Sequence, residues 1–352
     1  MKKSLLALAL MSAFSGAAFA QSSVTIYGIV DVGVQGLSNG SGKQAKVESG
    51  QESGSRLGFK GTEDLGGGLK ANFVLEQGIL VDTGASDQGG LTFGRRSFVG
   101  LSGDFGTVNL GRDKTPTFQL FDNFDPFGSG LINSGGGLKA IYFIGGKSTT
   151  SAAASTANTT GRDGNAVYYY TPATLGGFYA VGEYAAGEVV GNNSAGRSLG
   201  ATFGYKADGL DIAYNYVKDN AYSATLGVNG IKANTIAVNY DFGVAKPVFI
   251  YQKKSDDAGV STKYMTVGVT APVDAAGKVV ATFTKVTDDT VKAGSAIGSA
   301  KQFAVGYQYA LSKRTDLYTA YARTNQDAKS AIVGSTAGAN INEITAGVRH
   351  QF

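Results

Sequence analysis

The sequence predicts an all-β fold, a 16-stranded antiparallel β-barrel that crosses a membrane. Three observations lead to this fold class. Apolar and polar residues alternate with a period of two in segments of about ten residues, which indicates long strands with one apolar face. Short turns and long polar connections alternate along the chain. The composition, with 52 Gly, 18 Tyr, 19 Phe and only 5 Pro, is typical of a sheet protein and poor in helix formers.

Residues 1–20 read as a secretory signal peptide. Two lysines precede a short apolar stretch, and Ala18-Phe19-Ala20 forms a small-residue cleavage site. A membrane anchor is the alternative, but the apolar stretch is short and Gln21 is followed at once by strand-like sequence. We therefore expect a signal peptide over 1–20 and one barrel domain over 21–352.

The alternation that predicts strands recurs along the whole mature chain. Apolar residues occupy every second position in the following sets: Val24, Ile26, Val30, Val32; Leu69, Ala71, Phe73, Leu75; Leu210, Ile212, Tyr214, Tyr216; Ile236, Val238, Tyr240, Phe242; Phe303, Val305, Tyr307, Tyr309; and Ile344, Ala346, Val348. Strands of this kind bury one face in lipid and turn the other toward water.

The connections are of two kinds that follow each other in turn. Tight Gly, Asp or Pro turns lie near 64–68, 103–106, 172–177, 207–209, 241–244, 272–277 and 311–315. Long polar stretches lie near 35–52, 82–90, 114–163, 187–196, 219–231, 253–262, 286–300 and 325–341. An even number of strands, with short turns on the periplasmic side and long loops outside, is typical of bacterial outer-membrane barrels. These connections imply about sixteen strands.

Lipid offers no partner for backbone N–H and C=O groups, so a membrane-spanning sheet must close on itself. With sixteen strands the barrel is too wide for side chains to fill, and the lumen holds water. A soluble β-solenoid would show a fixed repeat, and an array of sandwich domains would show breaks in the pattern. The sequence has neither, so a single water-filled barrel is the simpler interpretation.

Composition also excludes several functional classes. The chain has no Cys and one His, which leaves little from which to build a metal or catalytic site, and we expect no enzyme activity and no cofactor. A net charge of +4 is too small for nucleic-acid binding. An outer-membrane enzyme would need a clustered Ser, His and acid at the rim, which the sequence lacks. An adhesin role of the loops stays open.

Several passages resemble the trimeric general porins of Gram-negative bacteria, in the branch that holds the neisserial and anion-selective porins. They are SVTIYG (23–28), SRLGFKGTEDLGGGLKANFVLEQG (55–78), RRSFVGLSGDFGTVNLGRD (95–113), AVYYYTPATLGGF (166–178), SKRT (312–315) and the terminal VRHQF (348–352). The passages span the mature chain in the family's order, and the blocks around 61–71 and 101–112 are highly specific.

The resemblance implies a homotrimer, a third extracellular loop folded into the lumen, and Phe352 as a barrel-assembly signal. The partners expected from it are outer-membrane lipid and lipopolysaccharide, the barrel-assembly machinery, and small anionic and neutral solutes. The longest connection, 114–163, agrees with an inward loop, because four phenylalanines at 118, 121, 124 and 127 suit an inner wall better than a water-exposed surface. A loop that covers a subunit interface is the alternative.

Charged residues of the lumen are the candidate site, because pores discriminate by the charges at their narrowest ring. Side-chain parity turns Arg56, Lys60 and Arg96 inward and leaves Arg95 undecided. Arginines matching Arg56, Arg95, Arg96 and Arg162 form a basic ladder in the resembling porins. The acidic side of the predicted constriction comprises Glu76, Asp113, Asp122 and Asp125.

These observations predict an outer-membrane porin for passive diffusion of small hydrophilic solutes and ions, weakly selective for anions. A channel specific for one small anion, such as phosphate or a dicarboxylate, is the alternative.

Overall fold

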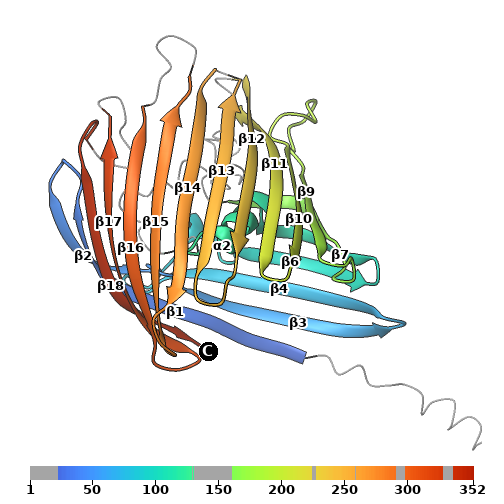
Figure 1. The fold of residues 1–352 in the computed structure, drawn as a ribbon. Helices are drawn as coiled ribbons and strands as arrows, with labels where there is room; N and C mark the ends of the chain where they lie inside the picture. Colours follow the sequence, from blue (N-terminus) through green and yellow to red (C-terminus); the bar gives the residue numbers. More distant parts are fainter. Residues whose placement is uncertain are drawn as a thin grey trace, which may run out of the picture.

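A computed structural model describes residues 23–128, 130, 161–223, 227–257, 259–290, 298–327 and 336–352. The predicted signal peptide lies outside these residues, as does most of the stretch from 129 to 160. The described part of the chain forms one antiparallel sheet that curls into a barrel (Figure 1). None of its helices is long and apolar enough to cross a membrane.

The bounds of the elements follow the predicted alternation. The strands are β1 (Ser23–Ser38), β2 (Lys43–Ser49), β3 (Arg56–Gly66), β4 (Leu69–Leu80), β5 (Ala85–Ser86), β6 (Arg96–Gly103), β7 (Gly106–Lys114), β8 (Arg162–Tyr170), β9 (Phe178–Ala185), β10 (Ser198–Ala207), β11 (Leu210–Ser223), β12 (Gly227–Tyr240), β13 (Lys246–Asp256), β14 (Ser261–Pro272), β15 (Gly277–Asp288), β16 (Ala300–Ala310), β17 (Thr315–Gln326) and β18 (Ile341–Gln351). The helices are the 3₁₀-helix η1 (Gln88–Gly90) and the α-helix α2 (Pro116–Phe124).

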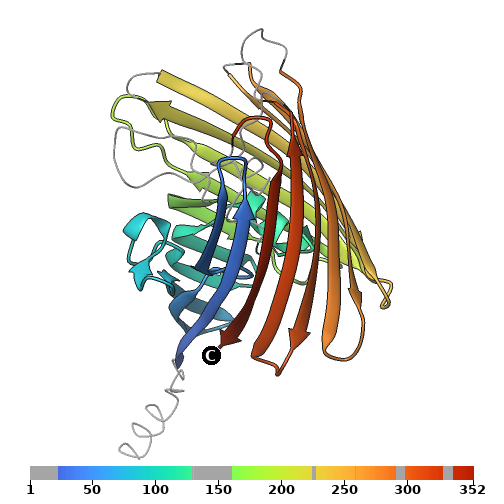
Figure 2. The same ribbon diagram turned by 90° about the vertical axis from the view of Figure 1, so that its left-hand side faces the viewer.

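The barrel wall has sixteen strands, as predicted. The sheet contains 18 strands in the described residues, but β5 pairs only with the end of β4, and β2 and β3 lie one after the other along β1. Counting β2 and β3 as one wall strand and leaving out β5 gives sixteen. β1 pairs with β18 from Ile29↔Gln351 to Ser38↔Asn342, so the first and last strands close the barrel (Figure 2).

The strands have an apolar outer face, as the alternation predicts. On β6, Val99 and Leu101 are 58% and 46% exposed, and Phe203 on β10 is 59% exposed. The inward positions next to them are polar or small, and many are buried by neighbouring side chains. Exposed apolar residues on most of the long strands are what a lipid-facing wall requires.

Several of the predicted long connections are shorter than expected. β1 and β2 continue through most of the stretch 35–52, joined by a tight turn at 39–42. β11 and β12 likewise extend into 219–231. The polar composition of these stretches reflects strands that continue into water beyond the lipid. Sheet pairing continues there because it satisfies the backbone in water as it does in lipid.

The described start of the longest connection packs against the inner face of the barrel wall. Thr115 caps α2 by accepting a hydrogen bond from the Phe118 N–H, and Pro116 occupies the first turn. Leu120, Phe121 and Phe124 are buried against the inner faces of β11 to β16, where small residues such as Ala213 and Ala237 leave room for the rings. In Figure 1, α2 lies on the inner side of the curled sheet.

Beyond α2 the same connection continues along the inner wall toward β17. Phe127 packs on a second cluster formed by Val280, Ala304 and Tyr318 of β15, β16 and β17. A Cβ added at Gly130 would lie 1.5 Å from the carbonyl oxygen of Glu52, so the backbone of this connection touches the segment between β2 and β3. The connection therefore divides the lumen at the level of these contacts.

Candidate functional site

A cavity of about 440 Å³ lies between the inner wall and α2 and is lined by most of the predicted basic residues. Its cationic side chains are Arg56, Arg95, Lys114 and Arg162, and its acidic side chains are Glu52 and Asp122. We call it the arginine cavity. Basic groups outnumber acidic ones in its lining, so its field favours anions.

Arg95 enters the cavity although the alternation left its direction undecided. It directly precedes β6, and its Nε lies 2.7 Å from Oε1 of Glu76 on β4. Glu76 Oε2 also accepts a hydrogen bond of 2.8 Å from the Tyr27 hydroxyl. Arg95 and Glu76 are 5% and 3% exposed. The carboxylate is thus fully engaged and fixes the guanidinium, and does not line the cavity itself.

Arg96 is held away from the arginine cavity by Asp113. Its Nε and one terminal nitrogen each lie 2.8 Å from an oxygen of Asp113, which is a bidentate pair between β6 and β7. The Tyr170 hydroxyl donates to the same carboxylate at 3.4 Å. Asp113 therefore pairs with a predicted ladder arginine, and neither residue lines the cavity.

Lys114 is a cavity residue that the sequence reasoning did not single out. Its Nζ lies 2.5 Å from Oδ2 of Asp122 on α2 and 5.3 Å from the ring centre of Phe118. The guanidinium of Arg162 stacks on the same ring at 4.8 Å. Phe118 thus orders two cations at once. Lys114 ends β7 directly before the helix, and this position at a strand-to-loop junction was the signal available in the sequence.

A second inward segment supplies the other side of the cavity. β1 pairs with β2 up to Val32↔Ser49 and with β3 from Ile29↔Arg56. Residues 50–55 lie between these pairs, and only two residues of β1, Val30 and Asp31, stand opposite them. The surplus backbone leaves the sheet toward the lumen, and we call residues 50–55 the inner bulge. Its first three residues, 50–52, belong to the stretch 35–52 that the sequence predicts as a long polar connection.

Asp31 fastens the inner bulge. Its Oδ2 accepts hydrogen bonds from the backbone N–H groups of Glu52 at 2.8 Å and Ser53 at 2.6 Å, and its Oδ1 accepts one of 2.6 Å from the Tyr318 hydroxyl. The bulge is tied to further strands by side chains. Gln308 donates to Glu52 at 2.8 Å, and Arg349 donates to Ser53 at 3.0 Å. These bonds hold the bulge against β1, β16, β17 and β18.

The inner bulge in turn orients two arginines. The Arg56 Nε donates to the carbonyl oxygen of Gly54 at 2.8 Å. A Cβ on Gly54 would come within 2.6 Å of a terminal nitrogen of Arg95, so glycine is what lets that guanidinium approach. The bulge is therefore a structural support of the basic wall.

The remaining predicted residues lie elsewhere. Lys60 is on the same face of β3 as Arg56 but nearer the short-turn end, where its Nζ lies 5.2 Å from the Tyr27 ring centre. Asp125 follows α2, and its Oδ1 accepts a hydrogen bond from the Phe127 N–H. Phe352 exchanges backbone hydrogen bonds of 3.2 Å with Gly28, and its ring lies over that glycine. None of the three lines the arginine cavity.

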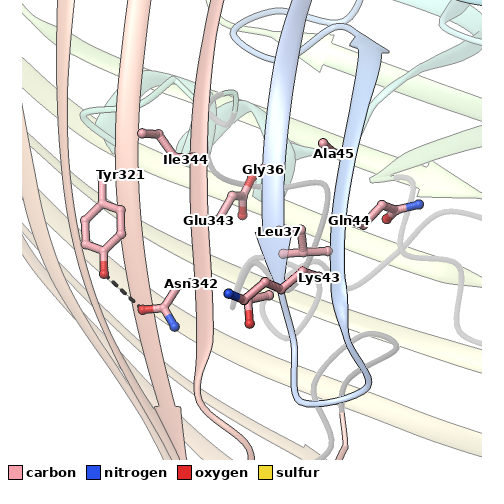
Figure 3. Close-up of a pocket in the computed structure, with 10 residues that line it drawn as sticks. Gly36, Leu37, Lys43, Gln44, Ala45, Tyr321, Asn342, Glu343 and Ile344 are labelled. Carbon is pink, nitrogen blue, oxygen red and sulfur yellow. Dashed lines mark hydrogen bonds between the residues drawn. The ribbon is translucent and has the colours of Figure 1, made fainter.

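A groove of about 450 Å³ lies on the barrel's outer rim (Figure 3). It runs between the β1–β2 hairpin and the β17–β18 pair, with Gly36 and Ala45 on one side and Ile344 on the other. The Tyr321 hydroxyl donates to Asn342 across the β17–β18 pair at 2.9 Å. Ile344 is 57% exposed on the outer face, so this groove does not belong to the lumen.

The chain is similar to known porins over its whole length. Residues 7–329 match the family described as Gram-negative porin. The chain is 37% identical to outer membrane porin protein 32 of Delftia acidovorans, with all of both chains covered. It is 44% identical over 136 residues to a major outer membrane protein P.IB of Neisseria gonorrhoeae, which covers 37% of each chain.

Solved structures show the same fold. The anion-selective porin from Comamonas acidovorans aligns with a TM-score of 0.80 at 33% identity, over 94% of this chain and 100% of the other. A trimer form of OmpT from Vibrio cholerae aligns with a TM-score of 0.68 at 16% identity, which reflects fold alone. With its closed sixteen-strand wall and this similarity, the chain belongs to the Gram-negative porin family of the outer membrane.

Proposed function

We propose that this outer-membrane channel conducts small hydrophilic solutes and ions passively through the arginine cavity, with a weak preference for anions. One observation carries the proposal: Arg56, Arg95, Lys114 and Arg162 converge on a cavity that holds two acidic groups. A passing anion meets an attractive field there, and a cation meets a repulsive one. Asp122, on the α2 side, gives this field a transverse direction. The proposal includes no chemical step, and we propose that the chain is not an enzyme.

Reversal potential across a planar bilayer with a salt gradient tests the proposal. Arg56→Gln and Arg162→Gln are the informative variants, because both guanidinium groups line the arginine cavity. Each should move the reversal potential toward zero selectivity. Lys60→Gln is the matched control, because Lys60 shares the strand and face of Arg56 but not the cavity. Equal shifts in Arg56→Gln and Lys60→Gln would contradict a role for the arginine cavity.

A second candidate is a channel with a saturable site for one small anion, phosphate or a dicarboxylate. The convergence of three guanidinium groups on one cavity favours it, since guanidinium groups match carboxylate and phosphate geometry. Chloride current measured against increasing phosphate or succinate distinguishes the candidates. Concentration-dependent block that saturates and is lost in Arg162→Gln supports the specific channel. A current that changes only with bulk conductivity supports general diffusion.

We further propose the partners that the family resemblance implied: a homotrimer, lipopolysaccharide in the outer leaflet, and the barrel-assembly machinery acting on the terminal Phe352. The OmpT trimer form supports the first by similarity of fold. We also propose that residues 1–20 are removed as a signal peptide, which N-terminal sequencing of the exported protein tests. A mature protein that begins well away from Gln21 would contradict that assignment.

A further inference from the structure

A row of cations encircles one side of the barrel on its outer face. Seven consecutive strands, β11 to β17, each place one Lys or Arg at an outward position. The outward direction follows from the sheet register, which sets each of these residues in line with exposed apolar residues such as Ile236, Val267 and Phe303. We call this row the cationic belt, and its members are Lys218, Lys232, Lys253, Lys263, Lys285, Lys301 and Arg323.

The belt lies at one height. Counted from the short-turn end of each strand, the seven residues are 8, 8, 7, 9, 8, 9 and 8 positions away. At about 3.3 Å per residue and a strand tilt of roughly 40°, this is about 20 Å along the barrel axis. The apolar band of such a barrel is about 25 Å tall. The belt thus lies near its upper edge, on the side of the long connections.

Neighbouring outward positions place the belt at a lipid boundary. On each strand, the outward position two residues closer to the short turn is mainly aromatic or apolar. These positions are Tyr216, Asn234, Tyr251, Met265, Phe283, Phe303 and Tyr321. The outward position two residues closer to the long connection is uncharged on every one of these strands. These positions are Asn220, Gly230, Ser255, Ser261, Thr287, Ser299 and Asn325. Aromatic side chains below and polar ones above are the pattern of a membrane interface.

The belt sets like charges face to face. Lys218 is directly opposite Lys232, Lys253 opposite Lys263, and Lys285 opposite Lys301. Like charges directly opposite each other destabilise a sheet, so an anion bound between them would stabilise the arrangement. Among the described residues, one ion pair involves the belt: Lys263 Nζ lies 3.0 Å from Asp289. Within the part of the chain that the structure describes, the other six belt cations form no ion pair.

Four strands outside the belt carry no charged outward residue at its height. At the same height, seven to nine residues from the short-turn ends, the outward residues of β1, β3, β4 and β10 are Val32, Phe59, Gln77 and Leu199. These uncharged positions suit contact with neighbouring copies. The belt extends over β11 to β17, and its last member, Arg323, stands opposite Asn342 at the edge of the outer-rim groove.

We infer that the cationic belt binds the phosphate groups of lipopolysaccharide in the outer leaflet. The inference rests on the lipopolysaccharide partner proposed above and gives that partner its site. A phosphate monoester carries about −1.5 to −2 charges, which matches a facing pair of lysines. A phosphodiester carries one negative charge and matches a pair less well. The monoester phosphates of lipid A therefore fit the three pairs better than ordinary phospholipid headgroups.

Binding of fluorescent diphosphoryl lipid A to the folded, purified trimer in detergent tests this inference. The belt variant is Lys218→Gln/Lys232→Gln/Lys285→Gln/Lys301→Gln. The control variant removes four lysines near the short-turn ends, at positions 206, 246, 278 and 313, by the same substitution. We expect the belt variant to bind about 100-fold more weakly than wild type at low salt, and the control to bind like wild type.

Binding of two further lipids tests whether the monoester phosphates of lipid A are the group that is recognised. Wild type should bind dephosphorylated lipid A and phosphatidylglycerol much more weakly than diphosphoryl lipid A. Equal affinity of wild type and belt variant, equal loss in the control, or equal affinity for phosphatidylglycerol would each overturn the inference. Bilayer reversal potential of the belt variant should equal that of wild type. A failed lipid test with intact anion selectivity would thus leave the proposed channel function standing.

Discussion

The Nε of Arg95 lies 2.7 Å from Oε1 of Glu76, with both side chains almost fully buried inside the barrel. The pair joins the residue before β6 to the middle of β4 and brings a guanidinium to the arginine cavity. A buried ion pair is not in itself a source of stability, because both charges lose their hydration. The ion pair serves instead to position the Arg95 guanidinium, since Glu76 and Gly54 together determine where this group lies.

Arg95→Gln should destabilise the barrel by about 3 kcal/mol, because it leaves the carboxylate of Glu76 buried without its cation. The double variant Arg95→Gln/Glu76→Gln should recover much of this loss, since no uncompensated charge remains. Urea unfolding in lipid vesicles, followed by far-UV circular dichroism, measures both; the chain has no Trp to report by fluorescence. A double variant as unstable as the single one would show that the charge imbalance is not the cause.

Asp122→Asn should increase anion selectivity. The substitution removes one of the two acidic groups that line the arginine cavity and releases Lys114 from its ion pair. Asp125→Asn is the control, because Asp125 lies on the same connection outside the cavity and asparagine can still accept from the Phe127 N–H. Reversal potential in a salt gradient should shift toward the anion limit for Asp122→Asn alone. A shift of the same size in both variants would argue against a local field at the cavity.

Asp31→Ala should release the inner bulge. The variant loses three hydrogen bonds to a buried carboxylate, two of them from the bulge backbone, and we expect a loss of about 2 kcal/mol or more in unfolding free energy. Because Gly54 then no longer fixes Arg56, single-channel conductance should also change. Tyr318→Phe removes one of the three bonds and leaves the backbone ones, so it should have the smaller effect on conductance. Wild-type conductance in Asp31→Ala would contradict the supporting role of the bulge.

Phe121→Ala should detach α2 from the inner wall. Phe121 is fully buried and packs edge-on to Tyr264 at 6.0 Å between ring centres, so its truncation should cost about 3 kcal/mol. Phe118→Ala is the comparison, because this half-buried ring mainly stacks with Arg162 and Lys114 and should cost about 1 kcal/mol. Current noise should rise in Phe121→Ala as the helix loses its anchor. Equal stability of the two variants would contradict the anchoring role of Phe121.

By itself, the sequence determined the barrel, its sixteen strands and its wet interior. These follow from a period-two alternation and from the order of the turns, which are local properties. The alternation along each strand, which is also a local property, predicts that Arg56, Lys60 and Arg96 point inward. The inward course of the residues after Lys114 was predictable from their phenylalanines, because such side chains need a wall to cover them.

Only the tertiary structure decided which of these charges share a cavity. Arg96 pairs with Asp113 while Arg95 reaches the arginine cavity, a choice made by partners on other strands. The inner bulge depends on a register gap between β1, β2 and β3, and its fastening by Asp31, Tyr318 and Arg349 joins residues about 300 positions apart. The cationic belt is likewise a product of register, because its lysines meet only when seven strands are aligned. Pairing between distant strands sets these relationships, and no local pattern encodes it.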